Sequence, residues 1–396
     1  MPTFEPFRGM RYNLDSVRLD QVIAPPYDVI GSAERSTLAH RHPANSVAVE
    51  LPEPDISAGV DRYQVAATVL DRWISEGVLV TEPRPAFYPY KMTSSDGRST
   101  TGVIGALGVG PDDGVLPHEE TLPKARTDRL DLLRATSTNS SPIWGLSLAT
   151  GLTEILDTRA APVGDALDDD GVRHQIWVTD APDAIGALRR KIEGAALVVA
   201  DGHHRYQTAR TYREEMRSAN GGRPGDYDLV MAYVVELVED QVTVGPIHRT
   251  VDGLDPSVDV VTAFSRWFDV VRAGPAERRV VGALGESGSL ALVTPDGAWL
   301  LAPRTEAIEA AGNDLDSAVV GLVLAELPEH SVSYRHSWQE AVSDVEDGTA
   351  QAAVLLRPVG VKRIAEWAAD AKRMPPKTSY FSPKPRTGMV FRRLSD

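Results

Sequence analysis

Cysteine is absent from the 396 residues of the sequence. Its absence excludes disulfides, thiolate zinc sites and cysteine nucleophiles. The sequence also lacks an apolar run long enough to span a membrane, and its N-terminal segment has no apolar signal core. We therefore expect a cytoplasmic protein without a membrane partner, and the oligomeric state stays open.

Positive charge is scarce overall, because the net charge is −15 at pH 7. Such an acidic balance argues against nucleic acid as a partner. Residues 361–396 are the exception, with nine Lys or Arg against three acidic residues and a local charge of +6. This basic segment suits a small polyanion, although a solvated helix end and tail would show the same charge pattern.

Low-complexity segments are absent as well, because the 32 glycines and 28 prolines are scattered as turn residues. The hydrophobic content of 42% is that of a globular protein, and the length allows two or three domains. We expect an α+β fold with three parts. These are an N-terminal α+β domain at 1–112, a catalytic core at 113–255, and a C-terminal α/β domain at 256–396 that contributes a basic loop to the site.

Apolar periodicity predicts the individual elements. The predicted helices are 61–75, 182–192, 203–216, 256–271, 315–327, 338–345 and 361–374. The predicted strands are 86–93, 101–109, 143–148, 172–178, 195–200, 229–238, 290–294, 298–302 and 352–356. Residues 241–244 are predicted to return as the hairpin partner of 229–238.

Five adjacent polar residues stand where a buried strand is predicted to turn into a helix. The strand is 195–200, and the helix starts at His203. A helix start has free backbone N–H groups and a partial positive charge, which together favour an anion such as phosphate. Polar residues that cluster at the end of a strand favour a functional site over ordinary surface.

Each residue in this group suits phosphate chemistry. Gly202 lets a ligand approach the backbone closely. The side chains of His203, His204 and Arg205 supply hydrogen-bond donors suited to phosphate oxygens. The Asp201 carboxylate either holds Mg²⁺, orients a histidine or caps the helix.

Two segments nearer the N-terminus carry further candidates. Tyr27 and Asp28 follow a proline pair, and they are either ligand contacts or part of a structural corner. His118 and Glu119 stand in a strongly charged segment, in which Glu119 or Glu120 is a candidate general base. The alternative is a charged first helical turn, where acidic residues are favoured by the helix dipole.

The C-terminal half adds two groups of candidates. His248 and Arg249, at a predicted strand end, form either a second donor pair for the same ligand or part of a surface loop. The segment 374–385 is rich in proline, lysine and hydroxyl groups, and a rigid loop of this kind suits phosphate contact. Its candidate phosphate ligands are Lys377, Thr378, Ser379 and Lys384.

Motifs along most of the chain resemble those of a prokaryotic family known as domain of unknown function 1015. In order, they are PFRGMRYN, APPYDVI, LPHEET with KARTDRL, ADGHHRYQTA, PIHR and MPPKTSYFSPK. This family name implies no activity.

From Leu116 onward the chain also resembles the free serine kinases of the ParB/sulfiredoxin-like superfamily. The shared motifs are PHE at 117–119, DGHHR at 201–205, and an SPK-type loop at 382–384 or 376–378. About 110 N-terminal residues have no counterpart in those kinases. The resemblance implies a ParB/sulfiredoxin-like nucleotide-binding core.

The resemblance also implies an activity. It is the transfer of a phosphoryl group from ADP or ATP, with Mg²⁺, to the hydroxyl of free L-serine or a similar small hydroxy compound. Glu119 would be the catalytic base, and Asp201 and His203 would be catalytic, with Asp201 on the metal. His204 and Arg205 would bind phosphate. A Walker A motif and a kinase Gly-rich loop are not evident, so the familiar kinase folds are not expected.

Two other functions remain open. Relatives with this fold include nucleotide-binding and nucleotide-hydrolysing regulators of the ParB type, although the acidic charge and the lack of a clear helix-turn-helix count against one here. A metal-dependent hydrolase would use His118, Glu119, His203 and His204. The sequence has no helical HExxH spacing to support it.

Overall fold

The computed structural model describes residues 1–111, 113–117, 126–156, 160–370 and 372–394. In this part of the chain the structure is a mixture of helices and of both parallel and antiparallel strands, which confirms the predicted α+β class. No helix in the described ranges is long and apolar enough to cross a membrane.

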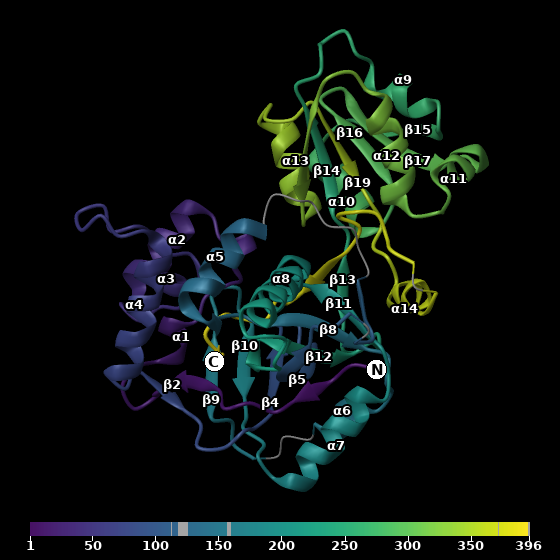
Figure 1. The fold of residues 1–396 in the computed structure, drawn as a ribbon. Helices are drawn as coiled ribbons and strands as arrows, with labels where there is room; N and C mark the ends of the chain where they lie inside the picture. The colour runs from purple at the N-terminus through teal and green to yellow at the C-terminus, as the bar shows by residue number, and fades with distance from the viewer. Residues whose placement is uncertain (112, 118–125, 157–159, 371, 395–396) are drawn as a thin grey trace. The chain divides into compact units, whose positions relative to one another are not determined.

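The described residues form two compact units (Figure 1). The first contains the chain up to residue 243 and the C-terminal segment from 383, with a short piece at 368–370. The second contains 244–367 and 372–382. Strands from the predicted N-terminal domain and from the predicted core pair in one sheet of the first unit. The three-domain division at 112 and 255 stays a prediction.

A mixed sheet forms the centre of the first unit. Its strands are β1 (Phe4–Glu5), β4 (Tyr88–Thr93), β5 (Ser99–Gly108), β6 (Val115–Pro117), β8 (Ile143–Ser147), β9 (Gly164–Leu167), β10 (Arg173–Ile176), β11 (Leu197–Asp201) and β12 (Leu229–Glu236). Their order is β6-β11-β8-β12-β5-β4-β10-β9, with β1 beside β5. β6 runs parallel to β11 and β8 parallel to β12, whereas the other neighbours are antiparallel.

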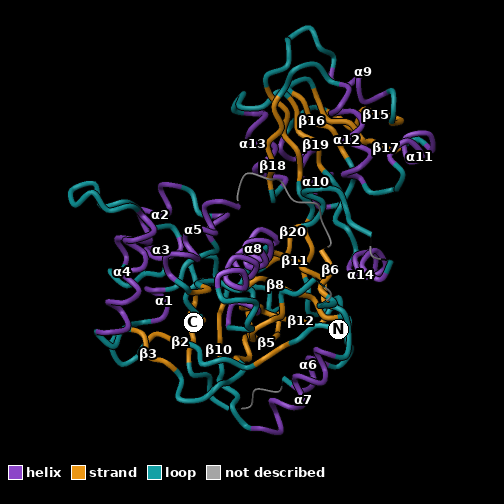
Figure 2. The backbone as a smooth tube through the Cα atoms, viewed as in Figure 1, coloured by secondary structure: helices purple, strands orange, loops and turns teal. Residues whose placement is uncertain are grey.

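Helices and short strands surround this sheet. The helices are α1 (Leu19–Val22), α2 (Ser32–Arg41), α3 (Val47–Glu50), α4 (Arg62–Ser75), α5 (Arg126–Thr136), α6 (Leu152–Ile155), α7 (Pro182–Glu193) and α8 (His203–Ala219). Two short 3-10 helices are η1 (Tyr27–Val29) and η3 (Asp226–Asp228), and the short strands are β2 (Met10–Tyr12), β3 (Leu79–Thr81), β7 (Thr138–Asn139) and β21 (Arg392–Arg393). Helix α8 packs across β8 and β12 (Figure 2).

The central strands form because their residues suit burial on both faces. β12 (LVMAYVVE) is buried from its second residue to its last, and β8 is buried throughout. Such continuous runs of β-branched and apolar residues are typical of strands that are covered on both sides. Helix α4, in contrast, starts where the Asp61 carboxylate accepts hydrogen bonds from the backbone N–H groups of Tyr63 and Gln64.

The second unit has an antiparallel sheet of its own. Its strands are β14 (His248–Asp252), β15 (Phe268–Gly274), β16 (Ala291–Thr294), β17 (Gly297–Pro303), β18 (Ser331–Arg335) and β19 (Ala352–Leu355). Their order is β15-β17-β16-β19-β14-β18. The helices are α9 (Val260–Ser265), α10 (Arg278–Glu286), α11 (Thr305–Ala311), α12 (Asp316–Glu326), α13 (Trp338–Glu346) and α14 (Val361–Ala369), and a separate small sheet pairs β13 (Thr243–Gly245) with β20 (Tyr380–Ser382).

Alternating side chains give this sheet two apolar faces. Leu292 and Val354 belong to one core cluster, which also contains residues of α9, α11 and α12. Their neighbours Ala291 and Ala353 belong to another cluster, with residues of α10 and α13. Because successive residues of a strand point to opposite faces, helices cover both sides of the sheet.

Two predicted elements are wrong. Residues 256–271 form the short helix α9 followed by β15, because the chain from Phe268 pairs with β17 instead of continuing the helix. Residues 241–244 do not return along β12, and β13 pairs with β20. In both cases the strand partner comes from a distant part of the sequence, and a local pattern does not identify it.

Candidate functional site

The predicted strand-to-helix turn at Asp201–Arg205 is present in the first unit. β11 ends at Asp201, and α8 begins at His203. Gly202 lies between them with φ 86°, in the left-handed region that favours glycine. Gly202 is the N-cap residue of α8, so Asp201 is not the helix cap. His203 and His204 are half-buried in the first turn of the helix.

The Asp201 carboxylate contacts two cationic side chains. Its Oδ2 accepts a hydrogen bond from the Arg205 guanidinium at 2.8 Å, and its Oδ1 lies 2.8 Å from the Lys384 ammonium. A Cβ atom added to Gly202 would lie 3.1 Å from atoms of the Arg205 guanidinium. Glycine therefore both allows the turn and leaves room for the arginine to fold back over it.

Lys384 brings a third part of the chain to this point. Its ammonium group lies 2.7 Å from Oδ2 of Asp28 as well as 2.8 Å from Asp201, and its side chain is only 10% exposed. Asp28 belongs to η1, which follows the proline pair. Three candidate segments of the sequence, around Asp28, Asp201 and Lys384, thus meet in the first unit.

The pKa values in this cluster reflect its alternating charges. Burial raises the pKa of Asp201, but Lys384 and Arg205 outweigh it and lower the value to about 2. Burial lowers the pKa of Lys384, but Asp201 and Asp28 outweigh it and raise the value above the usual range. The carboxylate and the ammonium are therefore both charged at neutral pH.

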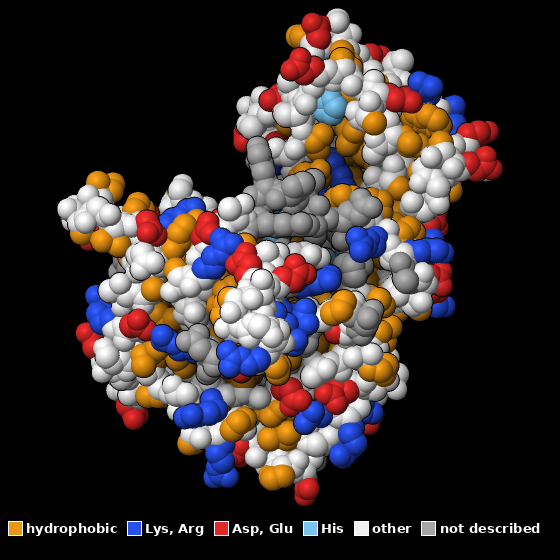
Figure 3. Space-filling view, in the orientation of Figure 1, with side chains coloured by type: hydrophobic (Ala, Val, Ile, Leu, Met, Phe, Trp, Pro, Cys, Tyr) orange, Lys and Arg blue, Asp and Glu red, His pale blue; other side chains and the backbone are white. Residues whose placement is uncertain are grey.

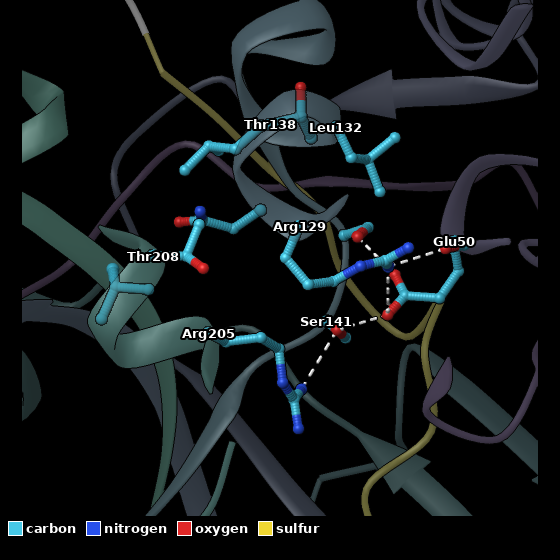
Figure 4. Close-up of a pocket in the computed structure, with 11 residues that line it drawn as sticks. Glu50, Arg129, Leu132, Thr138, Ser141, Arg205 and Thr208 are labelled. Atoms are coloured by element: carbon cyan, nitrogen blue, oxygen red, sulfur yellow. Dashed lines mark hydrogen bonds and ion pairs between the residues drawn. The ribbon is translucent and has the colours of Figure 1, made fainter. Parts of the chain in front are cut away.

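On its other side, Arg205 reaches residues that the sequence analysis did not identify. Its guanidinium donates to the hydroxyl of Ser141 at 3.1 Å and to the carbonyl oxygen of Pro142 at 2.5 Å. Ser141 in turn donates to Oε1 of Glu50 at 3.0 Å, and Ser140 donates to Oε2 at 2.5 Å. Figure 4 shows the contacts from Arg205 to Ser141 and onward to Glu50.

Arg129 completes this network. Its guanidinium donates to the backbone oxygen of Glu50 at 2.8 Å and contacts the Asp128 carboxylate at 2.6 Å. It also lies 4.3 Å from the centre of the Tyr27 ring, as in a cation–π contact. Glu50 is 1% exposed. A carboxylate within the apolar run Val47 to Leu51 is the sequence signal that would have identified Glu50, and Arg129 lies in the KARTDRL motif.

A second buried network anchors the segment that carries Lys384. The Arg386 guanidinium bonds to the Asp168 carboxylate, which also contacts Nε2 of His174 at 2.7 Å. Nδ1 of the same imidazole lies 2.7 Å from the Tyr90 hydroxyl, and that hydroxyl accepts from the backbone N–H of Arg386 at 3.2 Å. These bonds fix the backbone two residues beyond Lys384, so they position its side chain.

The remaining described candidates lie in the second unit. His248 and Arg249 begin β14 and are buried, whereas the sequence pattern predicts them at the end of a strand. Nδ1 of His248 accepts from the backbone N–H of Leu356 at 3.1 Å. The Arg249 guanidinium and the Lys377 ammonium lie 5.4 Å and 5.9 Å from the centre of the same Tyr334 ring.

Two hydroxyl candidates of the C-terminal loop are also in the second unit. The Thr378 hydroxyl donates to the backbone oxygen of Pro375 and lies 2.7 Å from the hydroxyl of Ser317. Ser379 is buried. His118 and Glu119 lie outside the described residues. Within the described ranges, no group of three or more His, Asp or Glu side chains is arranged to hold a metal ion.

Comparison with known proteins identifies similarity to one family and to several solved structures. The model of the family described as "Protein of unknown function (DUF1015)" matches residues 4–322. No curated protein matches the chain. A free serine kinase variant in complex with AMP is 13% identical with a TM-score of 0.39, and the match covers 71% of this chain and 88% of the kinase chain.

Two further solved structures show the same degree of similarity. A free serine kinase variant in complex with ADP is 13% identical with a TM-score of 0.40, covering 73% of this chain and 90% of its own. A C-terminally truncated SbnI from Staphylococcus aureus is also 13% identical, with a TM-score of 0.37, covering 72% and 84% respectively.

Proposed function

The chain belongs to the DUF1015 family of proteins of unknown function, and from its own residues we propose that it is a nucleotide-dependent small-molecule kinase. The phosphoryl donor is ADP or ATP, and the acceptor is the hydroxyl of free L-serine or a similar small hydroxy compound. The nucleotide-binding core is of the ParB/sulfiredoxin-like type in this proposal. Asp201, Gly202 and the residues that follow them form the phosphate site.

One observation carries the proposal: Lys384 and Arg205 converge on Asp201 at the start of α8. Phosphoryl transfer requires little covalent chemistry from a protein, but it requires cations and backbone N–H groups around the phosphate oxygens. A helix start with an ammonium and a guanidinium beside it provides both. Gly202 lets the nucleotide approach the backbone.

In the transfer, one bond to phosphorus forms and another breaks. The acceptor hydroxyl oxygen attacks the terminal phosphorus, the bond from that phosphorus to the bridging oxygen breaks, and the nucleotide leaves one phosphate shorter. The hydroxyl proton passes to the Glu119 carboxylate in this proposal, because a serine hydroxyl barely ionises at neutral pH. Lys384 and Arg205 neutralise charge on the phosphate oxygens.

Mg²⁺ fits the oxygen donors of this site. Magnesium in such sites is held by one or two carboxylates together with substrate phosphates. Asp201 and Asp28 are two carboxylates close enough together to share the Lys384 ammonium. They would hold the ion, which when bound would neutralise phosphate charge.

The first prediction concerns Glu119. With Mg²⁺ and L-serine or a panel of hydroxy acids and sugars, phosphorus NMR should detect a phosphorylated product from ADP or ATP. Glu119→Gln should lower turnover about a hundredfold or more, because it removes the basic oxygen. Nucleotide affinity, measured by titration calorimetry, should stay nearly unchanged. Glu120→Gln is the matched control and should retain activity.

Two results would change the proposal. Nucleotide binding without transfer to any acceptor would favour the ParB-type regulatory alternative. Undiminished turnover in Glu119→Gln would leave the kinase but discard this base. A metal-dependent hydrolase would instead release inorganic phosphate without requiring an acceptor, which the same NMR spectra would detect.

A further inference from the structure

A small cavity lies beside the candidate phosphate site, within the first unit. Its volume is about 50 Å³, and its walls come from α3, α5, β7, α8 and β12 (Figure 4). A water molecule needs roughly 10–15 Å³ of such volume, so the cavity has room for several non-hydrogen atoms. Arg205, Ser141 and Glu50 are among the residues that line it.

One wall presents a buried hydrogen-bonding group. Thr208 lines the cavity from α8, is 4% exposed, and its hydroxyl has no hydrogen-bond partner among the described residues. The Nε atom of Arg205 is also buried and has no hydrogen-bond partner among the described residues. A buried polar group without a partner is unfavourable, because its lost hydrogen bonds to water are not replaced. This cost indicates that a hydrogen-bonding occupant belongs in the cavity.

The opposite wall presents acceptors. The hydroxyl protons of Ser140 and Ser141 point to the Glu50 carboxylate, so the lone pairs of these two oxygens are oriented away from it. The hydroxyl of a ligand could donate to Ser140 and accept from Thr208. Leu132, Leu133 and Val230 add an apolar side to the same cavity.

The charges around the cavity are already balanced. Arg129 is paired with Asp128 and lies 3.8 Å from Glu50, and Arg205 is paired with Asp201. A ligand with a net charge would therefore find no unpaired opposite charge on Arg129, Glu50 or Arg205. The cost of removing that charge from water would not be offset. The lining thus selects a compact hydroxy compound without net charge.

We infer that this cavity is the acceptor pocket of the proposed kinase, and the inference rests on that proposed function. Arg205 is the physical link, because its guanidinium contacts Asp201 at the phosphate site and Ser141 at the cavity. A hydroxyl compound in the cavity would therefore lie next to the phosphoryl group. Glu50, Ser140 and Ser141 become specificity-determining residues, and Thr208 orients the acceptor.

The test measures binding, so it does not depend on turnover. The probes are glycerol, which has no charged group, L-serine, which is a zwitterion without net charge, and D-glycerate, which is an anion. Saturation-transfer NMR and calorimetry, with and without ADP, should detect glycerol or L-serine more strongly than D-glycerate. Thr208→Val should weaken that binding about three- to tenfold, because it removes one hydrogen bond and little volume.

Two matched variants control for the fold. Thr211→Val changes an exposed threonine on the same helix, and it should leave binding unchanged. Thr208→Ser keeps the hydroxyl and should retain binding if Thr208→Val does not fold. ADP affinity should be the same in all three variants.

The outcomes separate this inference from the proposed function. If ADP binds but none of the probes does, the cavity holds only water and the inference fails while the nucleotide site stands. Equal probe binding in Thr208→Val and the unaltered protein, or tightest binding of D-glycerate, would also overturn it. If ADP does not bind, the proposed kinase itself fails.

Discussion

At the scale of single residues, the main feature is the alternation of charge from Asp28 through Lys384 and Asp201 to Arg205. Both cations are largely removed from water but are compensated by carboxylates, so the fold tolerates them. A phosphate that binds here would replace one anionic partner by another. The affinity for nucleotide then depends on each of the two cations.

The second prediction tests Lys384. Lys384→Met keeps most of the volume but removes the ammonium, so nucleotide affinity should fall about 10- to 100-fold, the scale of a lost charge-assisted hydrogen bond. Titration calorimetry with ADP measures it. Lys362→Met, an exposed lysine of the same basic segment, is the control. An equal loss in both variants would mean that general charge attraction, and not this contact, binds the nucleotide.

The third prediction concerns the pH dependence of His248. Burial and the neighbouring Arg249 lower its pKa from 6.5 to about 4. The unfolded chain binds a proton at this residue near pH 6.5, whereas the folded chain does not. The contribution of His248 to stability is therefore full above pH 6.5 and is lost as the pH falls to about 4, a loss of about 3 kcal/mol.

The measurement is a histidine NMR titration together with urea unfolding at pH 7 and pH 4.5. His248→Gln should remove most of this extra pH dependence, whereas His330→Gln, at a partly exposed histidine, should not. A His248 resonance that titrates near pH 6.5 would contradict the assigned structural bond to Leu356.

The sequence predicts individual residues of the cluster, but it does not predict the contacts between them. Asp28, Asp201 and Lys384 are candidates because of their residue types and the prolines or helix start beside them. That Lys384 contacts Asp28, 356 positions away, follows only from the fold. A single carboxylate within an apolar run indicates that Glu50 is buried but not which residues it contacts, and a serine in a turn such as Ser141 carries no distinctive spacing.

At the scale of elements, the turn from β11 to α8 was predictable because a short apolar strand, a glycine and an amphipathic helix follow one another directly. The helix predicted over 256–271 failed for the opposite reason. Val270 and Val271 suit a strand as well as a helix, and the deciding partner, β17, lies about 30 residues further along.

The fourth prediction is at this turn. Gly202→Ala places a Cβ in a left-handed conformation and 3.1 Å from the Arg205 guanidinium. It should destabilise the protein by about 1–2 kcal/mol, and it should weaken nucleotide binding about tenfold because the arginine must move. Urea unfolding and calorimetry measure the two effects.

Gly222→Ala is the matched control, since Gly222 has φ 82° but no atom within 4 Å of an added Cβ among the described residues. It should lower stability by a similar amount without changing nucleotide affinity. An unchanged affinity in Gly202→Ala would show that the position of Arg205 does not depend on this glycine.

At the scale of the whole molecule, the C-terminal segment holds the first unit together. Thr387 pairs with Ala24, Phe391 pairs with Met10, and β21 pairs with β7. On the face seen in Figure 3, basic and acidic side chains are interspersed over the first unit and do not gather into a stripe of one sign. Some basic side chains of the last residues are instead buried in ion pairs, such as Arg386 with Asp168.

The return of the chain to its first unit also has a consequence for biosynthesis. About 140 residues of mostly second-unit sequence separate residue 243 from 383, where the chain re-enters the first unit. At ribosomal speeds of about 5–20 residues per second, this interval lasts roughly 7 to 30 seconds. During that time a nascent first unit would have the carboxylates of Asp28 and Asp201 but not the ammonium between them, so the site would be completed only after Lys384 has been synthesised.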